Sequence, residues 1–242
     1  MKTSESALIV GAGIGLSASI AKLFKKEGMT IALASRNIEK LNPIASSINA
    51  LCIECDVGSV SEVSSMFEQV DEAIGTPSVV VYNPSARIRG GIETLNPLDT
   101  KAALDITCFG AFLVAQQAAI RMLRRGSGSI FFTGASAGVK GFANSSVFAM
   151  GKFGLRGLAQ SLARELHPKN IHVGHFVIDG GIKSTNRRDL GDNTLLCPDE
   201  IAKIKQFRKD VLPTLWAEIK LNPSGSGYTV LSGLAQSNLV NY

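Results

Sequence analysis

The sequence contains few tyrosine, tryptophan, histidine and cysteine residues. Its 242 residues include three tyrosines, one tryptophan, three histidines and four cysteines. Four cysteines in a chain of this length do not form the dense disulfide framework of small secreted domains. Cys52 and Cys55 make one C-x-x-C pair, but no second pair or histidine cluster completes a zinc site, so we expect no metal.

Long apolar runs and runs of like charge are also missing. No stretch of 18 apolar residues occurs, so we expect no membrane span. The 25 basic and 20 acidic residues give a net charge of +5, and no run of five like charges suggests a nucleic-acid-binding tail. With 45% hydrophobic and 19% charged residues, the composition indicates a globular chain, which we expect in the cytoplasm.

Short apolar runs alternate with amphipathic segments along the whole chain. Apolar runs without polar alternation are typical of parallel strands that are covered on both faces, and right-handed crossovers then give a doubly wound α/β fold with three layers. We expect strands at 7–10, 30–34, 51–54, 78–82, 129–133, 171–178 and 215–219. We expect helices at 15–27, 37–48, 60–74, 99–124, 145–166 and 199–210.

A single domain accounts for most of the chain. No linker rich in proline, glycine or serine interrupts residues 1–222, and no internal repeat occurs. The segment Asn222-Pro-Ser-Gly-Ser-Gly227 reads as a loop, so we expect residues 223–242 to form a loop and tail.

Glycine is abundant, at 24 residues, and three glycines form the first motif. Gly11, Gly13 and Gly15 follow the first expected strand and open the first expected helix. Glycines in this context permit a tight turn and let backbone N–H groups approach a pyrophosphate at the helix N-terminus. The motif therefore predicts a dinucleotide site, and the alternative is a sharp turn without a ligand.

The end of the second expected strand distinguishes between two dinucleotides. An acidic residue at this point binds the ribose 2′-hydroxyl of NAD, whereas a nearby arginine accommodates the 2′-phosphate of NADP. This chain has Ser35 and Arg36 there, and the first acid is Glu39. We therefore expect NADP rather than NAD, and the alternative is that Arg36 is a solvated side chain at a helix start.

These motifs together resemble the short-chain dehydrogenase/reductase family. The glycine loop, Asp56 and Val57 after the third strand, Asn83 after the fourth and Lys152 after the fifth occur in the family's order, and the resemblance covers about residues 6–220. It implies a Rossmann-type sandwich with a mostly parallel seven-stranded sheet. It also implies NAD(P)(H) binding, hydride transfer to or from a small-molecule substrate, and a homodimer or homotetramer.

The resemblance implies roles for individual cofactor-binding residues. Asp56 would bind the adenine amino group with Val57 beside the ring, and Lys152 would bind the nicotinamide ribose. The remaining implied positions are Ile14 in the glycine loop, Asn83 in a motif that reads Asn83-Pro84-Ser85 here, Ile182 at the carboxamide, and Ser184 or Thr185 near a phosphate.

The catalytic part of the family pattern is incomplete. The family uses serine, tyrosine and lysine, with the tyrosine four residues before the lysine as the proton donor. That position is Phe148 here, and a phenyl ring has no proton to transfer. The serine position falls on Ala135 with Ser136 next to it, and Thr107 stands where the family has a helix asparagine.

Three interpretations remain open at this stage. A substitute proton relay could use Ser136, Ser145, Ser146, Thr107 or water. The substrate could need no strong acid, as in hydride transfer to an activated double bond. The chain could instead bind NADP(H) without catalysis and act in regulation or as a scaffold.

Basic residues follow several of the expected strands. They are Arg87, Arg89, Lys140, Lys183, Arg187 and Arg188. Ligands of such sheets bind at the carboxyl ends of the strands, and arginine forks match carboxylate or phosphate groups. An anionic substrate would suit this cluster, and the alternative is ordinary solvated loop charge.

Overall fold

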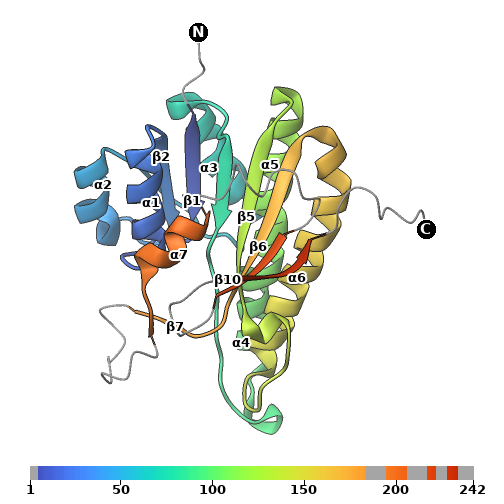
Figure 1. Cartoon of the computed structure of the whole chain (residues 1–242). Coiled ribbons are helices and arrows are strands. Elements are labelled where there is room, and N and C mark those ends of the chain that lie inside the picture. Colours follow the sequence, from blue (N-terminus) through green and yellow to red (C-terminus); the bar gives the residue numbers. More distant parts are fainter. Residues whose placement is uncertain (1–4, 184–194, 206–216, 222–227, 234–242) are drawn as a thin grey trace.

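The computed structural model describes residues 5–183, 195–205, 217–221 and 228–233 (Figure 1). Its main sheet has eight strands in the order β10-β9-β6-β5-β4-β1-β2-β3. Seven of them are parallel to their neighbours, and β10 pairs antiparallel with β9 at one edge. The strands are β1 Ser6–Val10, β2 Thr30–Ser35, β3 Leu51–Glu54, β4 Val79–Tyr82, β5 Gly128–Ala135, β6 Ile171–Ile178, β9 Ala217–Leu221 and β10 Tyr228–Gly233.

Helices cover both faces of the sheet, which confirms the doubly wound α/β fold. One face packs against α3, α5 and α6, and the other against α1, α2 and α7. The helices are α1 Leu16–Lys26, α2 Asn42–Ile48, α3 Val60–Ile74, α4 Pro97–Leu104, α5 Gly110–Arg125, α6 Ser146–Leu166 and α7 Pro198–Lys205. Short helical turns lie at η1 Glu39–Leu41, η2 Ile92–Thr94, η3 Asp105–Phe109, η4 Ser136–Gly138 and η5 His167–Lys169.

The central strands are apolar on both sides because both sides are buried. In β1, Leu8 and Val10 belong to the core under α3, α5 and α6, whereas Ala7 and Ile9 belong to the core under α1 and α2. All four are fully buried. This explains why the sequence shows continuous apolar runs instead of alternation.

The order in which successive strands are added to the sheet reverses at β1. The chain runs outward from β1 through β2 to β3, and then crosses to β4 on the other side of β1. The carboxyl ends of β1 and β4 therefore border a crevice at the point where ligands bind in open α/β sheets.

One expectation about the elements is corrected and another is refined. The sheet has eight strands and not seven, because Tyr228–Gly233 adds an edge strand where we expected loop and tail. The expected helical stretch at 99–124 is confirmed, since helix continues from Pro97 to Arg125. It contains the π-helical turn η3, whose Ile106 carbonyl accepts a hydrogen bond from the Tyr82 hydroxyl. π-helical turns of this kind are frequent near functional sites.

The same helical stretch is long and apolar. Within Pro97–Arg125 an 18-residue window has a mean hydropathy of 1.5, so by length and composition alone this helix could cross a membrane. Its buried residues Ala111, Val114, Ala118 and Met122 pack in the core beneath the sheet. About 44% of the apolar window is buried within the fold, as in the core helix of a globular domain, and the rest lies on the surface.

Candidate active site

The glycine loop turns sharply between β1 and α1. Gly11 has a φ of +72°, and a Cβ atom placed there would lie 2.6 Å from Pro84 Cγ. A Cβ atom at Gly13 or Gly15 would meet no atom within 4 Å. No side chain caps the N-terminus of α1. The loop is therefore closed against Pro84 and open toward the crevice, as a backbone cradle for an anion requires.

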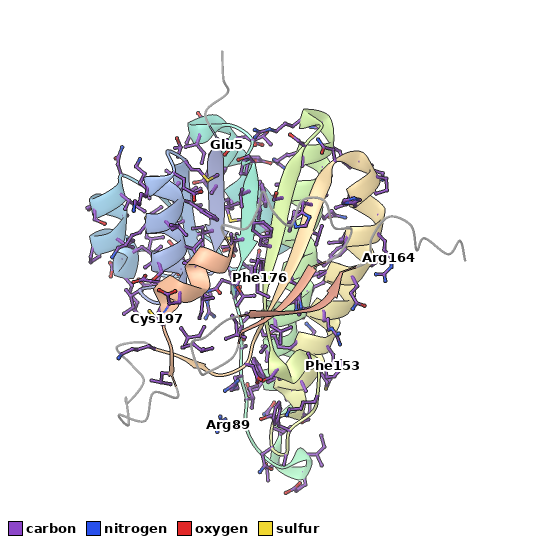
Figure 2. The ribbon with its side chains drawn as sticks, viewed as in Figure 1. Glu5, Arg89, Phe153, Arg164, Phe176 and Cys197 are labelled. Atoms are coloured by element: carbon purple, nitrogen blue, oxygen red, sulfur yellow. The ribbon has the colours of Figure 1, made fainter. Side chains whose placement is uncertain are left out.

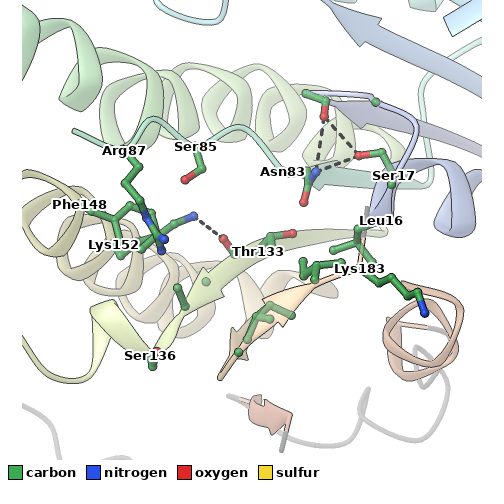
Figure 3. Close-up of a pocket in the computed structure, with 18 residues that line it drawn as sticks. Leu16, Ser17, Asn83, Ser85, Arg87, Thr133, Ser136, Phe148, Lys152 and Lys183 are labelled. Atoms are coloured by element: carbon green, nitrogen blue, oxygen red, sulfur yellow. Dashed lines mark hydrogen bonds between the residues drawn. The ribbon is translucent and has the colours of Figure 1, made fainter. Parts of the chain in front are cut away.

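Asn83 connects the end of β4 to this loop. Its side-chain amide donates to Ser17 Oγ at 2.9 Å and to the Gly11 carbonyl at 3.4 Å (Figure 3). Its backbone N–H donates to the Val10 carbonyl at 3.0 Å. Asn83 therefore holds the shape of the glycine loop in addition to lining the crevice.

A cavity of about 310 Å³ lies between the glycine loop and the ends of β2 and β3. Ser35, Arg36 and Val57 line it together. Asp56 lies next to Val57, and its carboxylate accepts the Gly58 N–H at 3.0 Å. The four positions expected at the adenosine end of the cofactor therefore lie close together. Of these, Ser35, Arg36 and Val57 line the cavity, and Asp56 is not among its described lining residues.

A second cavity, of about 600 Å³, continues from the same loop toward α6. The two cavities share Gly11, Asn83 and Ser85. The larger one is lined by 18 residues, among them the expected positions Gly13, Gly15, Ser136, Phe148, Lys152 and Ile182. Their volumes lie in or near the range of small-molecule and cofactor sites.

Lys152 lies at the end of the larger cavity that is far from the glycine loop (Figure 3). Its side chain is only 2% exposed, and its ammonium donates to the Thr133 carbonyl at 2.8 Å. Burial, together with the charge of Arg87, lowers the pKa of Lys152 to about 7. Lys152 can therefore exchange a proton near neutral pH.

Phe148 lies near both Lys152 and Arg87. The Phe148 ring is 6% exposed. The Arg87 guanidinium carbon lies 4.0 Å from the ring centroid, and Lys152 Nζ lies 5.8 Å from it. The sequence pointed to Arg87 as one of several basic loop residues, but it gave no sign that Arg87 stacks on Phe148.

Ser136 and Thr107 have different surroundings. Strand β5 ends at Ala135, and Ser136 begins the turn η4. Ala135 and Ser136 both line the larger cavity. Thr107 is buried in η3, and its hydroxyl accepts the Ala86 N–H at 3.0 Å. Thr107 therefore supports the loop that carries Arg87, and its expected catalytic role stays a prediction.

The remaining expected positions differ in their relation to the two cavities. The Ile14 side chain is 56% exposed and lines neither cavity, so only its backbone can take part in the loop. Of the basic residues, Arg87 and Lys183 line the larger cavity, whereas Arg89 and Lys140 do not. Ser184, Thr185, Arg187 and Arg188 lie outside the described residues.

Comparison with known proteins gives consistent results. Residues 5–194 match the family described as short chain dehydrogenase. The chain is 32% identical over 173 residues to carbonyl reductase family member 4 of Danio rerio, covering 70% of this chain and 73% of the relative. It is 27% identical over 189 residues to a 3-oxoacyl-[acyl-carrier-protein] reductase of Bos taurus, covering 77% and 79%.

Solved structures show the same likeness. A short-chain dehydrogenase from Rhodopseudomonas palustris superimposes with a TM-score of 0.78 at 31% identity, covering 90% of this chain and 98% of that one. A short-chain type dehydrogenase/reductase from Mycobacterium marinum superimposes with a TM-score of 0.83 at 23% identity, covering 93% and 96%. The second likeness concerns the fold alone.

Proposed function

Because the chain belongs to the short-chain dehydrogenase family, we propose that it is an NADP(H)-dependent oxidoreductase. It transfers hydride to or from a small organic substrate, either a carbonyl or alcohol compound or an activated double bond. The observation that carries this proposal is the continuity of the two cavities. They lead from Arg36, past the open glycine loop, to the buried Lys152.

The residues present fit a nicotinamide dinucleotide. The open faces of Gly13 and Gly15 and the uncapped N-terminus of α1 suit its pyrophosphate, with the backbone of Ile14 as a further contact. Ser184 or Thr185, outside the described residues, is assigned to a phosphate by the family pattern alone. Lys183 lies at the Leu16 end of the larger cavity, where its charge favours the same phosphates (Figure 3).

The two ends of the dinucleotide have their own residues. Asp56 and Val57 bind the adenine, and Lys152, with Asn83 and Ile182, binds the nicotinamide riboside. When bound, the nicotinamide supplies the hydride acceptor or donor.

NADP is favoured over NAD by the residues that line the smaller cavity. Ser35 and Arg36 stand at the end of β2, and no acid is among the described residues that line this cavity. The guanidinium and hydroxyl donors suit a 2′-phosphate, which an acid would repel.

A titration of bound reduced cofactor by fluorescence tests this assignment. We expect NADPH to bind more tightly than NADH, and Arg36→Asp to remove the preference. Lys40→Asp is the matched control, because Lys40 is an exposed cation near Arg36 that lines neither cavity. Equal affinities of the unmodified chain for both cofactors would overturn the NADP assignment.

Turnover tests the oxidoreductase proposal. In this proposal Lys152 orients the cofactor and Ser136 polarises the substrate oxygen, while Thr107 supports the site. We expect the full chain to oxidise NADPH in the presence of a panel of aldehydes, ketones and oxo acids, and Lys152→Met to abolish this activity.

A catalytically silent NADP(H)-binding protein is the second candidate. Phe148 favours it, because this buried ring provides no proton at the position where the family pattern has tyrosine. Two results together would support this candidate. The chain would bind NADPH without oxidising it in the presence of any member of the panel, and Phe148→Tyr would gain carbonyl reductase activity. The role of the protein would then be in regulation or as a scaffold.

The proposed assembly is a homodimer or homotetramer in the cytoplasm. Phe109 and Phe112 on η3 and α5, and Met150 and Phe153 on α6, are 41–54% exposed. Figure 2 labels Phe153 on the lower part of α6. Gly154 packs against Cys108, so these two segments adjoin. Burial of this apolar surface would stabilise an assembly. Sedimentation of the chain and of Phe153→Glu tests it, because the variant should dissociate.

A further inference from the structure

The loop after β4 forms the junction between the two cavities. Three residues line both cavities, namely Gly11, Asn83 and Ser85. Gly11 has no side chain, and the side-chain amide of Asn83 donates to Ser17 Oγ and to the Gly11 carbonyl. Ser85 is exposed, and its hydroxyl makes no hydrogen bond with the described residues. Ser85 therefore presents a polar group at the junction that the described part of the fold does not use.

The backbone at Ser85 is held on both sides. Before it, Pro84 packs on the glycine loop, since a Cβ atom placed on Gly11 would lie 2.6 Å from Pro84 Cγ. After it, the Ala86 N–H donates to the hydroxyl of the buried Thr107 at 3.0 Å. Proline also fixes its own φ angle. Ser85 is therefore positioned before a ligand binds, and a contact made by a preorganised group costs little ordering.

The Ser85 side chain lies on the same part of the larger cavity as Lys152. Figure 3 shows the Ser85 hydroxyl turned toward the side where the Lys152 ammonium lies, with Ser136 farther along the wall. The ammonium of Lys152 donates to the Thr133 carbonyl at 2.8 Å. An ammonium has three N–H donors and no acceptor. A ligand hydroxyl that accepts from Lys152 therefore still has its own proton to donate, and a serine oxygen can accept it.

A ribose supplies hydroxyls of this kind. Its two ring hydroxyls lie on neighbouring carbons, and each can both donate and accept a hydrogen bond. In the proposed function the nicotinamide ribose lies at Lys152, and the dinucleotide passes the junction at Ser85. No aspartate or glutamate is among the described residues that line the larger cavity, so they offer no carboxylate as the acceptor.

We propose that Ser85 is a further cofactor-binding residue, whose hydroxyl binds a hydroxyl of the nicotinamide ribose that Lys152 also contacts. The inference rests on the proposed function and adds to it a residue that the family resemblance did not point to. Because NADP and NAD carry the same nicotinamide ribose, the inference does not depend on which of them binds.

Calorimetric titration with two ligands tests the inference. NADPH contains the nicotinamide ribose, whereas adenosine 2′,5′-bisphosphate contains only the adenosine side of the cofactor. We expect Ser85→Ala to bind NADPH about three- to tenfold more weakly than the unmodified chain, because one hydrogen bond is lost. The same variant should bind adenosine 2′,5′-bisphosphate within about twofold of the unmodified chain, because this ligand lacks the contact.

Ser65→Ala is the matched control. Ser65 is an exposed serine on α3 that lines neither cavity, so its replacement removes the same hydroxyl far from the proposed contact. It should bind both ligands within about twofold of the unmodified chain. The comparison separates loss of the Ser85 contact from any general effect of removing a surface hydroxyl.

Two results for Ser85→Ala would overturn the inference. One is an unchanged affinity for NADPH. The other is an equal loss of affinity for both ligands, because the effect would then lie on the adenosine side or in the shape of the loop. If the unmodified chain binds NADH and not NADPH, the same comparison with NADH and ADP decides the inference. An unmodified chain that binds neither NADPH nor NADH would overturn the proposed function, and this inference with it.

Discussion

The buried ammonium of Lys152 makes the stability of this fold depend on pH. The folded pKa is about 7, against an ordinary value of 10.5. Between these two pH values the unfolded chain holds a proton on Lys152 that the folded chain has released. The free energy of unfolding therefore rises with pH across this window, and below pH 7 the cost of burying the charge is fully present.

Replacement by methionine removes this dependence. Each pH unit within the window contributes a little over about 1 kcal/mol for one fully linked proton. Between about pH 7.5 and about pH 9.5, Lys152 should therefore add about 2–3 kcal/mol to the free energy of unfolding. Lys152→Met keeps an unbranched side chain without charge. It also loses the hydrogen bond to the Thr133 carbonyl, which shifts its stability by an amount that does not vary with pH.

Urea unfolding of both proteins at the two pH values measures the effect. The change in unfolding free energy between the two pH values is measured for the unmodified chain and for Lys152→Met. Subtracting one change from the other gives the contribution of Lys152, because the contributions of the other titrating groups are the same in both proteins. Lys22→Met, on the exposed surface of α1, should keep the slope of the unmodified chain. Parallel slopes for the chain and Lys152→Met would refute the reasoning that burial lowers this pKa.

Three other substitutions have defined outcomes. Gly11→Ala should lower the free energy of unfolding by about 2–4 kcal/mol, because φ is +72° and the added Cβ would meet Pro84. Gly13→Ala should lower it by less than about 1 kcal/mol and chiefly weaken NADPH binding. Equal losses of unfolding free energy for the two variants in chemical denaturation would contradict this prediction. Phe148→Tyr should raise the rate of NADPH-dependent carbonyl reduction about 100-fold or more by supplying a general acid, and an unchanged rate in a steady-state assay would count against this. Tyr82→Phe should cost about 1–2 kcal/mol on thermal or urea unfolding, since its hydroxyl bonds the π-helical turn η3, and unchanged stability would contradict that.

The sequence predicted most of the elements because their signals are local. Helix α3 was expected at 60–74 and occupies Val60–Ile74, with Ser59 as its N-cap accepting the Glu62 N–H. The π-helical turn η3 within the long helix was not predicted, and its hydrogen bond to the Tyr82 hydroxyl joins residues 24 positions apart in the chain. The edge strand β10 was missed as well. The sequence before it reads as a loop, so the residues after that loop were predicted to be a tail and not a strand that pairs with β9.

The candidate site was predictable in part for the same reason. Motifs at the ends of strands predicted Gly11 and Arg36 as positions of one crevice, since parallel strands end at the same edge. The family resemblance implied Asn83 and Lys152. The sequence could not show that Asn83 also holds the glycine loop, because that contact joins residues 66 and 72 positions apart. Nor could it show that Phe148 supports Arg87.

The sequence by itself determined the family, the parallel sheet and the absence of a tyrosine four residues before Lys152. These depend on the order and spacing of residues along the chain. Only the tertiary structure decided what surrounds Phe148: a stacked guanidinium on the loop after β4 and a buried ammonium from its own helix. Such contacts arise when the sheet brings distant segments to one edge, and no local pattern in the sequence encodes them.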